Sequence, residues 1–304
     1  MWSDRKKRGG RLELSEVRKE IDRVDGAMRE LFLERMRLAD QVARVKAESG
    51  DSIYKPDRET AIIHRQTEGM DPALVREYTA FIRKIMEVSR MYQYGRMLEL
   101  RDCFPFQYAR RSRKMERFCV LNEDLCFCDS RDGGMMMAVN SYGDMAKAIK
   151  KGIADAGMGV MEEEGGDRSD ALLRLLLDEK MYITKCSQVT EAVQGMAAES
   201  ISRIVTFTDT PEVLPEHNRL CLMFSCPKRQ GGLASVLSMI ADYGVDLTAF
   251  DFCPRLGERR NFFAELAVNM DTGEGRALLW QLSQEAAPLQ ILGSYRYGEE
   301  DGWK

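Results

Sequence analysis

Residues 14–46, LSEVRKEIDRVDGAMRELFLERMRLADQVARVK, are the stretch of this sequence that decides the fold. Apolar side chains recur there at alternating spacings of three and four residues, and one arginine interrupts the series. The positions that follow this spacing are Leu14, Val17, Ile21, Val24, Met28, Leu31, Arg35, Leu38, Val42 and Val45. The pattern predicts a long helix with a seam of the coiled-coil type.

Such a helix is too long for the domain that carries it. A helix over residues 14–46 would be about 50 Å long at 1.5 Å per residue. A compact domain of a hundred residues is only about 30–35 Å across, given a radius of gyration near 13 Å. The seam therefore needs a partner outside its own domain, and we expect a homodimer formed through these helices.

Two further helices are expected before residue 100. The second helix should begin at Lys55-Pro56-Asp57, where proline suits the first turn and an acid suits the positive end. The third should begin at Asp71-Pro72, an N-cap followed by proline. Its buried stripe is expected to comprise Leu74, Tyr78, Phe81, Ile82, Ile85, Ser89, Tyr92 and Gln93, and to continue towards Leu100.

Composition indicates a soluble globular protein of two or three domains. The chain has 304 residues, of which 44% are hydrophobic and 31% charged, with a net charge of −4. Residues 1–100 carry 21 Lys and Arg against 18 Asp and Glu. This small positive excess suits an anionic small molecule and is too small to predict nucleic-acid binding.

Membrane insertion, secretion and metal binding are not expected. No apolar run is long enough to cross a bilayer, and no apolar segment follows the basic N-terminus. The eight cysteines form no C-x-x-C pair, and only two histidines accompany them. We expect a cytoplasmic protein with reduced thiols, no membrane partner, no metal and no cofactor.

Polar residues occupy positions on the predicted helices where apolar ones are expected. Arg35 lies at a core position of the seam, where an unpaired charge would cost several kcal/mol. Lys46 follows eleven residues later, about three turns away on nearly the same face. Ser89 and Gln93 are one turn apart on the third helix, and Arg58-Glu59 opens the second. These positions predict a site for an anionic ligand.

Each of these residues also has a purely structural explanation. Arg35 could fix the register of a coiled coil, and Lys46 could be a solvated helix end. Ser89 and Gln93 could form hydrogen bonds within the bundle, and Arg58-Glu59 could be a surface pair. A single anion site explains all six residues at once, whereas the structural explanations are independent of one another.

Arg18 adds a geometric argument for a site shared between subunits. It precedes Arg35 by 17 residues, which is about 25 Å along a helix and about 100° around it. The two side chains of one chain cannot hold the same small molecule. In an antiparallel dimer, Arg18 of one subunit can reach the site around Arg35 of the other.

The polar positions together resemble a known family. They follow the pattern Arg18-x16-Arg35-x10-Lys46, Arg58-Glu59 and Ser89-x3-Gln93. This pattern resembles the all-helical chorismate mutases, in particular the mutase domain fused to prephenate dehydratase, and it covers residues 14–97. The resemblance implies that Arg35, Arg58 and the other subunit's copy of Arg18 hold substrate carboxylates, with help from Ser89.

The resemblance also implies how the reacting atoms are held. Lys46 and Gln93 would donate hydrogen bonds to the ether oxygen of chorismate, and Glu59 would bind the ring hydroxyl. Lys55 stands where some members have an aspartate near that hydroxyl. The rearrangement of chorismate to prephenate is unimolecular and pericyclic, so it requires only a selected conformer and stabilisation of charge on the ether oxygen.

The C-terminal segment resembles a regulatory domain. Residues 219–296 alternate in the order β-α-β-β-α-β, which is the ferredoxin-like split unit. They resemble the ACT domain that ends prephenate dehydratases. The resemblance places candidate effector-binding residues at Gly231, Gly232, Leu233 and Asp251, where the last begins the segment Asp251-Phe252-Cys253-Pro254. The arginine and serine of the family's phenylalanine site are absent from that segment.

The middle segment resembles part of a prephenate dehydratase. The resemblance rests on residues 142–157 and 172–183, within 118–210. Ser202-Arg203-Ile204 stands where that family has its catalytic Thr-Arg-Phe, but about a hundred residues of the family's second lobe are missing before it. We expect a single α/β lobe that lacks dehydratase activity.

The expected protein is therefore multidomain, α and α+β. It comprises a three-helix, intertwined-dimer chorismate mutase at 12–102, a linker at 103–117, a dehydratase-like lobe at 118–210 and an ACT domain at 216–298. The expected function is chorismate mutase activity in the biosynthesis of phenylalanine. The alternatives are a bifunctional enzyme that still makes phenylpyruvate and a non-catalytic dimeric ligand sensor.

Overall fold

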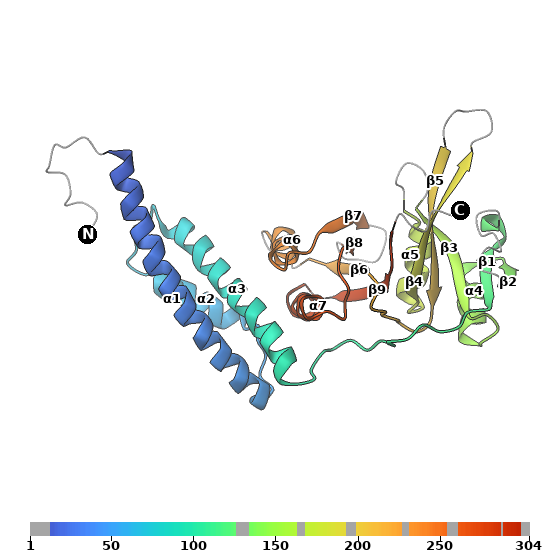
Figure 1. The fold of residues 1–304 in the computed structure, drawn as a ribbon, viewed down its shortest axis with the longest axis horizontal. Helices are drawn as coiled ribbons and strands as arrows, with labels where there is room; N and C mark the ends of the chain where they lie inside the picture. Colours follow the sequence, from blue (N-terminus) through green and yellow to red (C-terminus); the bar gives the residue numbers. More distant parts are fainter. Residues whose placement is uncertain are drawn as a thin grey trace. The chain divides into compact units, whose positions relative to one another are not determined.

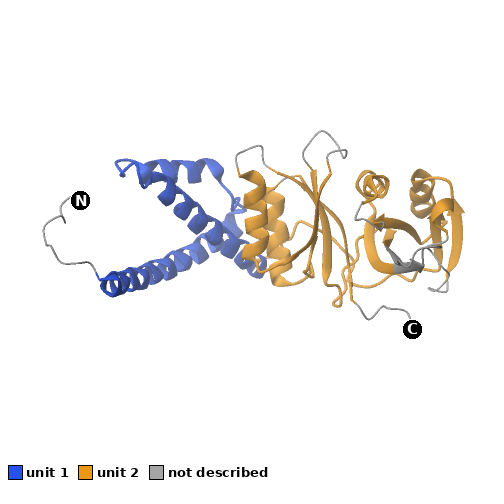
Figure 2. Cartoon of the chain, turned by 90° about the horizontal axis from the view of Figure 1, so that it is seen from above, with its two compact units in different colours: residues 1–100 blue, residues 101–304 orange. Residues whose placement is uncertain are grey.

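A computed structural model describes residues 13–125, 134–162, 168–192, 199–226, 231–253, 261–286 and 288–298. The chain divides into two compact units, residues 1–100 and 101–304 (Figure 2). In the part of the chain that the structure describes, no helix combines the length and the apolar character needed to cross a membrane.

The first unit consists of three helices, α1 (Leu14–Ser49), α2 (Pro56–Thr67) and α3 (Val75–Leu100) (Figure 1). The expected starts of α1 and α2 are confirmed, with Pro56 in the first turn of α2. The third helix begins three residues later than predicted for Pro72, at Val75. The reason is local: the Asp71 carboxylate accepts a hydrogen bond from the Ala73 backbone N–H at 3.0 Å and closes a separate turn before the helix.

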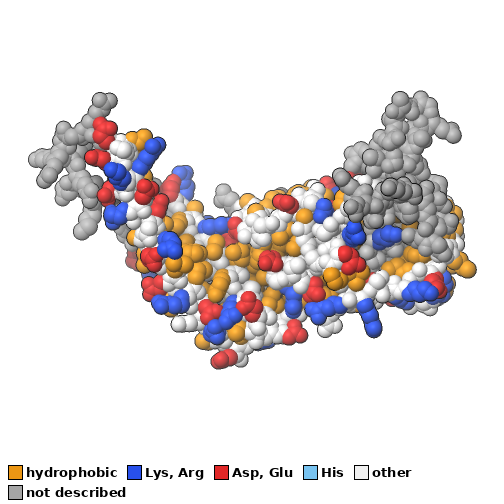
Figure 3. All heavy atoms as spheres, viewed as in Figure 1, with side chains coloured by type: hydrophobic (Ala, Val, Ile, Leu, Met, Phe, Trp, Pro, Cys, Tyr) orange, Lys and Arg blue, Asp and Glu red, His pale blue; other side chains and the backbone are white. Residues whose placement is uncertain are grey.

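Most of the α1 seam is exposed within one chain. Ala39, Ala43 and Lys46 are the buried residues of this 36-residue helix, and they lie in its C-terminal third, where α1 packs on α3. Figure 3 shows hydrophobic side chains at the surface of the first unit among charged ones. The exposed apolar positions of the seam are Leu14, Val17, Ile21, Val24, Met28, Leu31, Leu38, Val42 and Val45.

The buried face of α3 differs from the predicted stripe. Ser89 and Gln93 are buried as expected, but Leu74, Phe81 and Tyr92 are exposed, as is Leu100 at the end of the helix. The packing against α1 and α2 selects one of two apolar faces, and the periodicity does not distinguish between them. The residues buried on α3 are Met86, Ser89, Arg90, Gln93, Tyr94 and Met97.

The second unit begins with an α/β segment. Its elements are β1 (Arg117–Leu121), a 3-10 turn (Asn122–Asp124), β2 (Met135–Val139), α4 (Tyr142–Lys150), β3 (Ala156–Glu162), α5 (Asp170–Asp178), β4 (Tyr182–Ala192) and β5 (Glu199–Thr208). Strands β1, β2 and β3 are parallel, whereas β5 is antiparallel to both β3 and β4. The segment is therefore α/β, as the sequence predicts.

The C-terminal elements follow the expected β-α-β-β-α-β order. They are β6 (Arg219–Ser225), α6 (Gly232–Asp242), β7 (Leu247–Cys253), β8 (Asn261–Leu266), α7 (Gly273–Glu285) and β9 (Leu289–Tyr295). Their order across the sheet, β9-β6-β8-β7, is that of a ferredoxin-like unit.

The two halves of the second unit form one nine-stranded sheet, ordered β2-β1-β3-β5-β4-β9-β6-β8-β7. Strands β4 and β9 join them through a parallel pairing of Ile183 with Gly293. Gly293 has φ 147°, and a Cβ atom there would lie 2.2 Å from the Ile183 carbonyl oxygen. Only glycine permits this approach, so the sheet is continuous where the sequence suggested separate domains.

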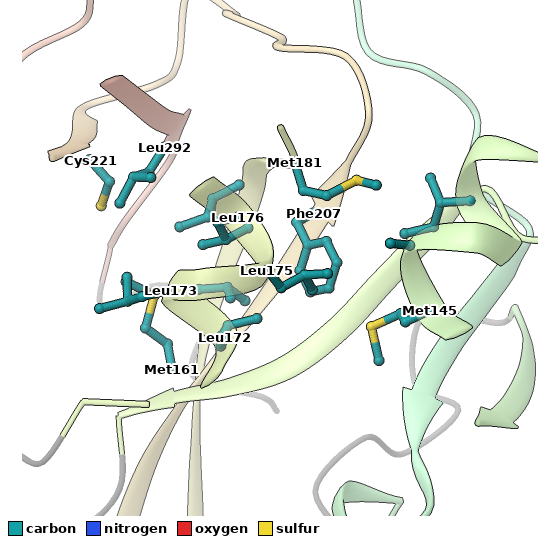
Figure 4. Packing of buried hydrophobic residues seen from close by; sticks show 14 of the residues in the cluster. Met145, Met161, Leu172, Leu173, Leu175, Leu176, Met181, Phe207, Cys221 and Leu292 are labelled. Atoms are coloured by element: carbon teal, nitrogen blue, oxygen red, sulfur yellow. The ribbon is translucent and has the colours of Figure 1, made fainter. Parts of the chain in front are cut away.

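Two apolar clusters lie on opposite faces of the ferredoxin-like strands. On β6, Leu220, Leu222 and Phe224 belong to the cluster that contains residues of α6 and α7. The alternate residues Cys221 and Met223 belong to the cluster built around α4 and α5, and Figure 4 shows the leucines of α5 within it. Helix α5 therefore helps to cover a sheet face that belongs to the other half of the unit.

The basic segment at 103–117 is not a free linker. Arg110 Nε lies 2.8 Å from Asp271 Oδ2, and Arg113 Nη1 lies 3.4 Å from Asp209 Oδ1. Arg117 lies 2.7 Å from Asp155 and begins β1. These acids, which are distant in sequence, hold the segment against the rest of the second unit.

A buried ion pair also connects the two halves of the sheet. Arg203 Nη2 on β5 lies 2.6 Å from Glu265 Oε2 on β8, and Tyr295 Oη on β9 donates to the same oxygen at 2.5 Å. Burial alone would raise the pKa of Glu265, but Arg203 and the hydrogen bonds from Tyr295 and Thr248 outweigh it and lower the pKa.

We expect Glu265→Ala to destabilise the second unit, because it leaves the Arg203 guanidinium buried without its closest anion. The loss in unfolding free energy should be about 3–5 kcal/mol. A matched control is Glu179→Ala, which removes the exposed ion pair with Lys150 and should cost less than about 1 kcal/mol. Urea denaturation of both variants measures the difference, and equal midpoints would contradict the role given to Glu265.

Candidate active site

A cavity of about 230 Å³ lies among the three helices of the first unit. All six polar residues that the sequence places on or beside the helix faces line it. Arg18 does not. The lining residues are Arg35, Leu38, Ala39, Val42, Lys46, Ile53, Lys55, Arg58, Glu59, Ile62, Met86, Ser89, Arg90 and Gln93.

The helical repeat and two alanines explain how α1 reaches this cavity. Arg35 and Lys46 are three turns apart on one face. Ala39 and Ala43 lie between them, with exposed fractions of 5% and 0%. Their small side chains allow α3 to approach α1 closely, so that both cations lie beside Ser89 and Gln93.

Backbone carbonyls and an amide, rather than carboxylates, hold the two α1 cations. Arg35 Nη1 donates to the Ile85 carbonyl oxygen at 3.1 Å. Lys46 Nζ donates to the Ile53 carbonyl oxygen at 3.0 Å and lies 3.5 Å from Gln93 Oε1. The Gln93 amide nitrogen donates to the Ser89 carbonyl oxygen at 3.1 Å. These contacts orient the cations and leave their charge uncancelled.

The side chains that line the cavity carry a net positive charge. Five cationic side chains and one carboxylate, Glu59, occur among the described residues that line it. Burial lowers the pKa of Lys46, and the nearby charges of Lys55 and Arg58 lower it further. Burial also lowers the pKa of Arg35. Because burial disfavours both charges, an anionic ligand would stabilise them, and at Lys46 it would also offset the repulsion from Lys55 and Arg58.

Arg90 is a lining residue that the sequence analysis missed. It is buried, and its Nη1 lies 2.5 Å from Glu59 Oε1. Its guanidinium carbon lies 5.1 Å from the centroid of the Tyr54 ring. A signal was available, because Arg90 and Gln93 are three residues apart and therefore share a helix face with Met86 and Met97.

Arg18 is exposed on α1. It precedes Arg35 by 17 residues of continuous helix, which corresponds to about 25 Å. The structure of one chain therefore brings together six of the seven predicted mutase positions and leaves the seventh outside.

The position that resembles a catalytic dehydratase arginine is engaged within the protein. Besides Glu265, Arg203 donates to Tyr295 Oη at 2.9 Å, and it lies 3.4 Å from Glu162. Its guanidinium carbon is 5.4 Å from the Tyr297 ring centroid. These contacts surround Arg203 with groups of this chain.

The candidate effector-binding residues lie in the ferredoxin-like half. Gly231 has φ 74° and caps α6, while Gly232 is buried as its first residue. Leu233 packs on the cluster beneath α6 and α7. Asp251 Oδ2 is 2.7 Å from Arg168 Nε, so its carboxylate already has a cationic partner. Pro254 lies outside the described residues.

Comparison with known proteins assigns the first unit. Residues 17–94 match the family described as chorismate mutase type II. The N-terminal helices therefore form a chorismate mutase type II domain, followed by a unit built on a mixed α/β sheet. No curated protein sequence matches the chain.

Three solved structures match parts of this chain at low sequence identity. A protein titled GqqA, a novel type of quorum quenching acylase, has a TM-score of 0.51 and 17% identity over 62% of this chain and 98% of that one. Prephenate dehydratase from Streptococcus mutans has a TM-score of 0.47 and 18% identity over 59% of this chain and 97% of that one. Prephenate dehydratase from Arthrobacter aurescens, in complex with L-Phe, has a TM-score of 0.48 and 13% identity over 60% of this chain and 90% of that one. At these identities the likeness concerns the fold alone.

Proposed function

We propose that this protein is a chorismate mutase, which rearranges chorismate to prephenate in the biosynthesis of phenylalanine. The observation that carries the proposal is the cavity of the chorismate mutase type II domain, whose lining holds five cationic side chains and one carboxylate. Chorismate is a dianion, so its two carboxylates would complement this net positive charge. A silent ligand sensor would not need Lys46 and Gln93 placed together beside the same cavity.

Six of the lining residues have a defined role in this proposal. Arg35 and Arg58 hold carboxylates of the substrate, and Ser89 helps to seat one of them. Lys46 and Gln93 donate hydrogen bonds to the ether oxygen, on which negative charge develops as the C–O bond breaks. Glu59 accepts a hydrogen bond from the ring hydroxyl.

The reaction needs no proton transfer and no nucleophile. The cationic contacts at the two carboxylates select the compact conformer in which the reacting carbons meet. The Lys46 ammonium then stabilises the transition state more than the ground state, because the ether oxygen is most negative as its bond breaks. Charge interactions of this kind strengthen in a cavity that excludes water.

A homodimer completes the site. The exposed seam on α1 provides the apolar surface, and a second copy of α1 is the partner whose periodicity fits it. An antiparallel arrangement brings Arg18 of the second copy to the cavity around Arg35, where it holds a carboxylate. A single chain leaves that position empty, since its own Arg18 is about 25 Å away along the helix.

The second unit has no dehydratase activity in this proposal and serves as a regulatory ACT-type domain. The support is the engagement of Arg203 with Glu265, Tyr295 and Glu162, which leaves it unavailable for a substrate carboxylate. The ferredoxin-like order of β6 to β9 is that of an ACT domain. An amino-acid effector would bind near Gly231, Gly232, Leu233 and Asp251.

The purified protein should convert chorismate to prephenate, and Arg35→Ala, Lys46→Ala and Gln93→Ala should each lower kcat/KM about 100- to 1000-fold. The rate should fall because each change removes a group that contacts the substrate. Circular dichroism and light scattering should show that the variants remain folded dimers. Loss of chorismate absorbance measures the rate. Wild-type turnover in Lys46→Ala would defeat the assignment.

Lys46→Arg is the control for charge. Burial lowers the pKa of Lys46 below that of an ordinary lysine, which is about 10.4. The wild-type rate should therefore begin to fall with rising pH before pH 10.4 is reached. The cation is present below the pKa of Lys46 and lost above it. An arginine stays charged, so this fall in rate should move to higher pH in Lys46→Arg.

The shared site predicts complementation between subunits. Arg18→Ala and Arg35→Ala homodimers should both be inactive. A heterodimer of the two contains one site without either change, so mixing under conditions of subunit exchange should restore up to about half of the activity per heterodimer. Heterodimers verified by mass spectrometry that stay inactive would mean that the subunits do not share the site in this way.

Prephenate given to the purified protein should yield no phenylpyruvate above the spontaneous rate. Dehydration with loss of carbon dioxide requires the carboxylate and the leaving hydroxyl to be held in one closed site. Enzyme-dependent phenylpyruvate that disappears in Arg203→Ala would favour the bifunctional alternative instead.

A further inference from the structure

Arg90 is a charged residue inside the helical unit whose role the proposed function does not yet include. It lies in the middle of α3, and its side chain is only 10% exposed. An arginine in this environment requires an anionic partner, because burying an unpaired charge costs several kcal/mol.

Two groups from another part of the unit contact Arg90. Glu59, in the first turn of α2, accepts from Nη1 through Oε1 at 2.5 Å. The Tyr54 ring, in the connection between α1 and α2, lies 5.1 Å from the guanidinium carbon. Arg90 therefore ties the start of α2 and the segment before it to α3, which carries Ser89 and Gln93.

The contact determines how Glu59 can be used. Four other cations line the cavity, and each would attract this carboxylate. The bond from Arg90 engages Oε1. Within the part of the chain that the structure describes, Oε2 makes no hydrogen bond, so one oxygen is fixed and the other is left to accept from a ligand.

We propose that Arg90 is a positioning residue that holds Glu59 to accept a hydrogen bond from a hydroxyl group of the substrate, and thereby sets specificity for that hydroxyl. The proposal rests on the proposed function, because the hydroxyl is that of the chorismate ring. In this role Arg90 acts through Glu59. Tyr54 assists by fixing the plane of the guanidinium.

A double-mutant cycle tests this coupling. Arg90→Met and Glu59→Gln should each lower kcat/KM for chorismate about 10- to 100-fold, mainly through a higher KM. The kcat/KM of the double variant should lie within about threefold of that of the less active single variant, because the two changes disrupt the same hydrogen bond to the substrate. Losses that multiply would overturn the proposal.

The exposed pair of Arg76 and Glu77 on the same helix provides the matched control. Arg76→Met, Glu77→Gln and their double variant make the same changes of charge outside the cavity. All three should retain kcat/KM within about twofold of wild type, as is usual for surface pairs. A comparable loss there would mean that the effect of Arg90 reflects net charge alone.

A chorismate analogue without the ring hydroxyl separates positioning from support of the fold. The analogue should react at rates that differ less than about threefold between wild type and Arg90→Met, because the hydrogen bond at issue is absent. An equal loss with both substrates would show that Arg90 serves the site as a whole.

Arg90→Lys keeps the test decisive if circular dichroism shows that Arg90→Met is unfolded. Lysine retains the charge and loses the stack on Tyr54, so it should recover part of the activity and remain coupled to Glu59→Gln. A wild-type protein without any mutase activity would instead refute the proposed function, a result distinct from uncoupled variants of an active enzyme.

Discussion

Repulsion among like charges around one small cavity is the constraint on which the helical unit depends. Arg35 and Lys46 are held there by backbone carbonyls and an amide, and the single carboxylate of the lining, Glu59, is engaged by Arg90. The folded chain therefore keeps a positive potential that it does not neutralise itself. Binding of a dianion would stabilise the folded state as well as prepare the reaction, because ligand affinity for the native state adds to its stability.

In the proposed dimer, the length of α1 would allow one helix to contribute to two sites. Its C-terminal third packs on α3 and supplies two cations to the local cavity, whereas its N-terminal part carries Arg18 and the exposed seam. A helix of 36 residues, about 54 Å long, separates these regions by more than the reach of any side chain. Formation of the dimer and completion of the cavity would then be the same event, and substrate affinity would depend on protein concentration.

Local patterns account for what could be predicted, and long-range contacts account for what could not. Spacing along one helix was enough to place Arg35 and Lys46 on one face, and both line the cavity. Arg90 shares a helix face with Gln93, but its contact with Glu59, 31 residues away, could not be predicted from local spacing. The apolar residues of α3 cover more than one face, so periodicity misassigned Phe81 as buried. The pairing of β4 with β9 could not be predicted either, because local sequence patterns do not show which strands distant in sequence pair with each other.

That pairing has a consequence for how the protein behaves at high concentration. Two separate sheets would present four edges, and each edge would offer unpaired N–H and C=O groups to another chain. The pairing of Ile183 with Gly293 turns β4 and β9 into interior strands and leaves β2 and β7 at the edges. A side chain at position 293 would collide with the Ile183 backbone and part the two strands. The damage would then appear first as aggregation, in a protein whose helical unit and cavity were still intact.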